Sequence, residues 1–179
     1  KIGEHTESII KYNKAIELDP NFADAYCNLG ASQTKLGNYK EAIASCNKAI
    51  ELKMNYAEAH NNLGNAFNDL GKYEEAISSY TKTIELKFDF AEAHNNLGNT
   101  LKELGRLEEA EASYKHAIKL KLDYSEAHSN LGITLQELGR LEEAEANYKQ
   151  SIVLKPGNAE AYWSRGIGAY ITGDLNAAQ

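Results

Sequence analysis

A period of 34 residues constrains this chain more than any other feature of its sequence. The stretch AEAHNNLGN occurs at residues 57–65 and again at 91–99, and related stretches begin at Ala23 and Ser125. When Ala23 is position one of a repeat, the third and fourth repeats are identical at 23 of 34 positions. Such a period is typical of arrays in which each unit packs only against its neighbours. We therefore expect an array of repeats and not one globular core.

The 179 residues form one predicted domain, 1–179, which divides into full and partial repeats. The full repeats are 23–56, 57–90, 91–124 and 125–158. Residues 1–22 are expected to hold the second helix of a partial repeat, and 159–179 to begin a further one.

Glycine at position fifteen of each repeat marks a turn. It follows a stretch of about fourteen residues with helical apolar spacing, as expected for a left-handed residue that ends a helix. A second amphipathic stretch follows, with apolar residues spaced three or four apart, such as Tyr73, Ala76, Ile77, Tyr80 and Ile84. Each repeat is therefore predicted to be a helix, a tight turn and a second helix.

The start of each first helix carries a capping pattern. An Asn or Asp stands three residues before an acid, as in Asn55 and Glu58 or Asp89 and Glu92. This spacing predicts a capping box, in which the first side chain accepts a hydrogen bond from a backbone amide.

Another glycine lies inside the first helix, at position eight. A glycine there costs about 1 kcal/mol relative to alanine, so its recurrence needs an offsetting gain. Position twenty, on the second helix, is a small residue, as in Ala42, Ala76 and Ala110. We expect the glycine to face this alanine and to let the two helices approach closely.

These residues resemble the tetratricopeptide repeat family. The resemblance rests on the period, on small residues at positions eight, twenty and twenty-seven, and on the aromatic residue at position twenty-four, which is Tyr80, Tyr114 and Tyr148. It implies an all-α, right-handed superhelical solenoid of antiparallel helix pairs, with first helices on the concave side. The chain departs from the family at position thirty-two, where Met54, Phe88 and Leu122 replace the usual proline.

Asparagines recur on one stripe of the first helices. They are Asn28, Asn62, Asn96 and Asn130 at position six, with Asn65 and Asn99 at position nine. An amide offers a donor and an acceptor, so this ladder could bind the backbone of an extended peptide. The pattern is similar to the repeat region of the O-linked N-acetylglucosamine transferases, in which a concave asparagine ladder holds substrate polypeptide. The alternative is that the amides bond within or between neighbouring helices.

Several other classes of protein are disfavoured. The net charge of −7 argues against nucleic acid and anionic membranes as partners. No apolar run approaches the roughly 20 residues that span a bilayer. No catalytic grouping and no metal or cofactor motif stands out, because the acids and His60, His94 and His128 recur with the period of the array. The sequence therefore predicts no enzyme, no metal and no cofactor.

Three functions stay open. We favour a protein-interaction scaffold that binds a peptide or partner segment. A second hypothesis is a homo-oligomer or filament, formed head to tail through apolar residues near the two ends: Ile2, Ile9, Tyr12, Tyr162, Trp163 and Leu175. A third makes the chain the substrate-docking arm of a larger glycosyltransferase. A cytoplasmic location is expected from the two cysteines, which form no redox or zinc motif.

Overall fold

A computed structural model describes residues 2–158, 162 and 164–166, and the regular structure in these residues is helical. The helices are α1 (Ile2–Leu18), α2 (Ala23–Lys35), α3 (Tyr39–Leu52), α4 (Ala57–Asp69), α5 (Tyr73–Leu86), α6 (Ala91–Glu103), α7 (Leu107–Leu120), α8 (Ser125–Glu137) and α9 (Leu141–Leu154). The predicted partial repeat 159–179 lies outside the described residues, except for 162 and 164–166.

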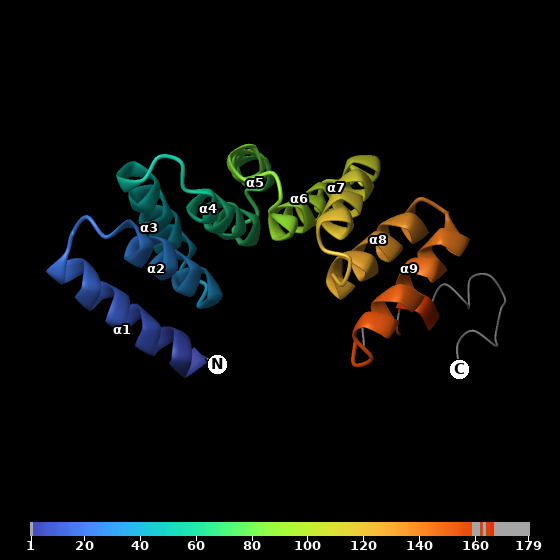
Figure 1. The fold of residues 1–179 in the computed structure, drawn as a ribbon, viewed down its shortest axis with the longest axis horizontal. Coiled ribbons are helices and arrows are strands. Elements are labelled where there is room, and N and C mark those ends of the chain that lie inside the picture. Colours follow the sequence, from blue (N-terminus) through green and yellow to red (C-terminus); the bar gives the residue numbers. More distant parts are fainter. Residues whose placement is uncertain (1, 159–161, 163, 167–179) are drawn as a thin grey trace. The chain divides into compact units, whose positions relative to one another are not determined.

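The chain consists of two compact parts, Lys1–Asp89 and Phe90–Gln179, and each is described by itself. In the first part, α2 pairs with α3 and α4 pairs with α5, while α1 packs on α2 and α3 packs on α4 (Figure 1). In the second part, α6 pairs with α7, α8 pairs with α9, and α7 packs on α8. The all-α fold of stacked helix pairs predicted from the sequence is thus confirmed.

The turn glycines end the first helices as predicted. Gly37, Gly71, Gly105 and Gly139 have φ between +71° and +79°. The amide of Gly105 donates to the carbonyl of Lys102 at 2.9 Å, and the next amide, of Arg106, donates to Leu101 at 2.9 Å. These bonds satisfy carbonyls that the end of the helix leaves without partners.

The glycine inside the first helix faces a tyrosine ring, not principally the small residue at position twenty that the sequence suggested. A Cβ atom added to Gly98 would lie 2.7 Å from Cε1 of Tyr114, and Gly64 and Gly132 have the same relation to Tyr80 and Tyr148. These three rings are at most 1% exposed. The glycine therefore makes room for a large aromatic side chain, whose burial offsets the cost of a glycine in a helix.

The first full repeat uses a smaller side chain at the same point. Position twenty-four is Cys46, and its Sγ lies 2.5 Å from a Cβ added to Gly30. Cys46 is fully buried, and burial raises the pKa of its thiol to about 12. The thiol is therefore protonated near neutral pH and fills space as an apolar group.

The predicted capping boxes are absent. The residues that precede the first helices are Phe22, Tyr56, Phe90 and Tyr124, with no side-chain hydrogen bond to the helix start. The acids of the pattern bond elsewhere: Asp24 accepts from the hydroxyl of Tyr56 at 2.7 Å, and Glu58 pairs with Lys87 at 3.2 Å. The local spacing does not produce capping boxes at Asp24 and Glu58, because these two acids bond to side chains that the fold brings from about 30 residues away.

None of the helices in the part of the chain that the structure describes is long and apolar enough to cross a membrane.

Candidate functional site

The predicted ladder residues all lie on first helices. Asn28 is exposed on α2, whereas the other five are half-buried on α4, α6 and α8: Asn62, Asn65, Asn96, Asn99 and Asn130. Each of the two parts of the chain carries three of these residues, and we call the surface that bears them in each part its amide face.

In the first part, the amide of Asn62 points back to the preceding repeat. Its Nδ2 lies 3.3 Å from both the backbone oxygen and the Sγ of Cys27 on α2. Asn65 is held within its own repeat, because the hydroxyl of Tyr80 donates to its Oδ1 at 2.8 Å. The buried tyrosine therefore supports both the core and an amide at the surface.

In the second part, four side chains form a connected network. Asn130 donates from Nδ2 to Oδ1 of Asn99 at 2.9 Å and to Oδ1 of Asn95 at 3.2 Å. The hydroxyl of Tyr114 donates to Oδ1 of Asn99 at 2.8 Å. Helices α6, α7 and α8 are thus joined through side-chain amides.

Asn95 was not among the predicted site residues. It is fully buried at position five, and its Nδ2 donates to Oε1 of Glu126 at 3.2 Å. The doublet of asparagines in HNNLGN was the available signal, because a buried amide at position five recurs as Asn61, which is 3% exposed. Buried amides of this kind need bonded partners, and for Asn95 the next repeat supplies two, Glu126 and Asn130.

The donors of Asn62 and Asn130 therefore bond between neighbouring first helices, which is the alternative interpretation of the ladder. Their oxygens, and the nitrogen of Asn99, take part in none of the hydrogen bonds among the described residues. Binding of a peptide by the amide face stays a prediction.

The recurring histidines occupy three different environments. Burial lowers the pKa of His60, while a hydrogen bond to the backbone of Met54 acts in the opposite direction. The ring of His94 stacks on that of His116 with centroids 5.4 Å apart, and His128 contacts Oδ1 of Asn147 at 3.1 Å. Within the described residues, no group of three His, Cys, Asp or Glu side chains could hold a metal ion.

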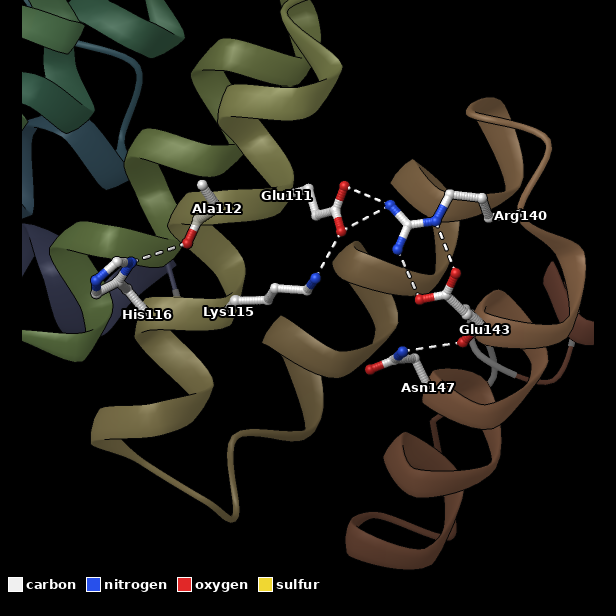
Figure 2. Close-up of polar contacts among 7 residues, drawn as sticks. All are labelled: Glu111, Ala112, Lys115, His116, Arg140, Glu143 and Asn147. Atoms are coloured by element: carbon white, nitrogen blue, oxygen red, sulfur yellow. Dashed lines mark hydrogen bonds and ion pairs between the residues drawn. The ribbon is translucent and has the colours of Figure 1, made fainter.

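An ion network joins the second helices α7 and α9. Arg140 donates from Nη1 to both oxygens of Glu111 at 2.7–2.8 Å, and from Nε and Nη2 to Glu143 at 2.6–2.7 Å (Figure 2). Lys115 also belongs to this network, because its Nζ lies 2.7 Å from Oε1 of Glu111. Burial raises the pKa of Glu111, but the bonds from Lys115 and Arg140 outweigh it and hold the pKa below its usual value.

Replacing Glu111 with glutamine is expected to lower the free energy of unfolding by about 1–2 kcal/mol at pH 7, since hydrogen bonds to charged groups contribute amounts of this order. The pKa of Glu111 is lower in the folded chain than in the unfolded chain, where it is about 4.3–4.5. The ionised carboxylate therefore stabilises the fold above the unfolded pKa, and this stabilisation is lost as the pH falls through the folded pKa. The difference in the free energy of unfolding between wild type and Glu111→Gln should thus be largest above about pH 5 and decrease below it. Urea unfolding at several pH values measures this. A difference that does not change between pH 7 and pH 3 would contradict it.

The apolar residues suggested for head-to-tail assembly are only partly described. Ile9 and Tyr12 on α1 are half-buried, and Tyr162 is exposed. Trp163, Leu175 and the side chain of Ile2 lie outside the described residues. Self-assembly stays a prediction.

Comparisons with solved structures identify relatives of the fold. YrrB, described as a TPR protein with an unusual peptide-binding site, is 25% identical with a TM-score of 0.73, over 93% of this chain and 86% of that chain. The MamA protein is 28% identical with a TM-score of 0.76, over 87% and 85%. A thermophilic TPR protein of Thermus thermophilus, TTC0263, is 23% identical with a TM-score of 0.80, over 94% and 92%, and shows the fold alone. The search of curated proteins found no significant match.

Four family models match the sequence. A TPR repeat model matches residues 1–37 and 64–105, and three tetratricopeptide repeat models match 89–156, 23–53 and 45–78. Together the matches cover residues 1–156 without a gap. With the glycine–tyrosine helix pairs described above, they show that the chain belongs to the tetratricopeptide repeat family.

Proposed function

We propose that this chain is a non-catalytic scaffold that binds an extended peptide or partner segment along an amide face. Its membership of the tetratricopeptide repeat family supports a protein-interaction scaffold in general. The observation that carries the finer proposal is the placement of exposed or half-buried amides at one register of successive first helices. The peptide-binding site named for YrrB adds support from a relative.

The amide face suits a main chain more than a particular side chain. An extended segment presents alternating N–H and C=O groups, and an asparagine side chain can complement either. The same first helices carry exposed acids, such as Glu92 and Glu137, so neutral or basic segments are favoured over acidic ones.

The test begins with a library of random twelve-residue peptides displayed on phage and selected against the whole chain. We expect peptides to be selected, and Asn28→Ala to weaken their binding about two- to tenfold, the effect of one net hydrogen bond. Asn28 is exposed, so the melting temperature should stay unchanged. Isothermal titration and thermal unfolding measure the two quantities.

Asn47→Ala is the matched control, because Asn47 is an exposed asparagine on the second helix α3. It should leave binding unchanged. A library that yields no binder, or binders equally affected by the two substitutions, would refute the role of the amide face.

A further inference from the structure

The pair Asn99–Asn130 is oriented by its own hydrogen bonds. Both hydrogens of Asn130 Nδ2 are used, on Oδ1 of Asn95 and Oδ1 of Asn99. Oδ1 of Asn99 accepts a second bond, from the hydroxyl of the fully buried Tyr114. A half-turn of the Asn130 amide would place its oxygen against two acceptors, and a half-turn of the Asn99 amide would place its nitrogen against two donors.

With the two amides in this orientation, one acceptor atom and one donor atom of the pair are not used in the network. The acceptor is Oδ1 of Asn130 and the donor is Nδ2 of Asn99, and neither atom takes part in a hydrogen bond among the described residues. Both side chains are half-buried and so retain contact with solvent. The two groups lie on adjacent first helices and belong to one hydrogen-bonded pair.

We propose that Asn99 and Asn130 form a clamp for the main chain of one residue in an extended segment, an inference that rests on the proposed function. The N–H of that residue donates to Oδ1 of Asn130, and its C=O accepts from Nδ2 of Asn99. In an extended chain the N–H and C=O of one residue point to the same side, and antiparallel strands exchange bonds in this way. The clamp therefore recognises the peptide main chain and does not distinguish between side chains.

The equivalent place in the first part of the chain lacks the clamp. Asn62 corresponds to Asn130, but Ala31 and Cys27 occupy the positions of Asn99 and Asn95 on the preceding first helix. Asn62 accordingly donates to Cys27. Between α2 and α4, the acceptor oxygen of Asn62 is therefore not paired with an asparagine donor at position nine of the preceding repeat.

Asn99→Asp separates the clamp from the structural role of Asn99. A carboxylate still accepts the bonds from Tyr114 and Asn130, but it has no Nδ2 donor. We expect an unchanged or slightly raised melting temperature and a three- to tenfold weaker affinity, measured with a library-selected peptide that contains no Lys or Arg. Asn47→Asp adds the same charge on the second helix α3 and should leave the affinity unchanged.

A second measurement tests recognition of the main chain directly. Each peptide bond of the same probe is replaced in turn by an ester, which removes one N–H donor. One position should lose affinity with wild type, and side-chain substitutions at that position should have little effect. Undiminished binding by Asn99→Asp, or an ester scan without a sensitive position, overturns the clamp while leaving peptide binding by the chain intact. Failure of wild type to bind any library peptide overturns both.

Discussion

Replacing Tyr114 with alanine is expected to lower the free energy of unfolding by about 3–5 kcal/mol, the range measured for large buried aromatic side chains. The side chain is fully buried between α6 and α7, where it lies against Gly98. Its loss leaves a cavity beside a residue that has no side chain to fill it. The hydroxyl bond to Asn99 is lost as well, so the surface amide loses its anchor. Denaturant unfolding followed by circular dichroism measures the change.

The matched control is Tyr73→Ala, at the start of α5, because Tyr73 is only half-buried. Tyr73→Ala should lower the free energy of unfolding clearly less than Tyr114→Ala does. Since repeats are stabilised by neighbours, hydrogen exchange should show the loss of protection centred on α6 and α7. Equal costs for the two tyrosines, or a loss of protection centred on α2 and α3, would contradict the prediction.

Replacing Gly98 with valine is expected to destabilise the chain by roughly 1–3 kcal/mol, despite the higher helix propensity of valine. The new Cβ would lie 2.7 Å from Cε1 of Tyr114, well inside van der Waals contact. The ring cannot move aside freely, because it is fully buried and its hydroxyl is bonded to Asn99. We therefore expect the strain to disturb the close packing of α6 against α7.

A double-mutant cycle identifies the cause. In a Tyr114→Ala background the ring is gone, so Gly98→Val should be neutral or stabilising because it fills part of the cavity. The coupling between the two sites should then exceed about 0.5 kcal/mol, the lower end for residues in contact. Additive costs would show that the glycine is required for a reason other than the tyrosine.

Much of the fold follows from local patterns. The 34-residue period, the helix–turn–helix unit and the glycines at the turns were predicted and are observed, because helix periodicity and a positive φ depend on residues close together in the chain. The need for a small residue at position eight was also predicted, although its partner was misidentified. The ring of position twenty-four, not the small residue of position twenty, fills that space.

The residues of the amide face could be found from the sequence, but the roles of their atoms could not. An asparagine has the same backbone requirements whichever way its amide is turned, so its donor is directed by whichever group the fold brings within hydrogen-bond distance. For Asn130 those groups are Asn95 and Asn99, 35 and 31 residues earlier. The same reasoning applies to Glu111 and Arg140, which are 29 residues apart.

The amino-acid sequence by itself thus determined which segments are helices, where they end and which face of each first helix carries amides, since these properties are local and periodic. Only the tertiary structure decided what each polar side chain bonds to. Stacking of helices places residues about one repeat apart in contact, and a rotatable polar group takes the partner that this stacking provides.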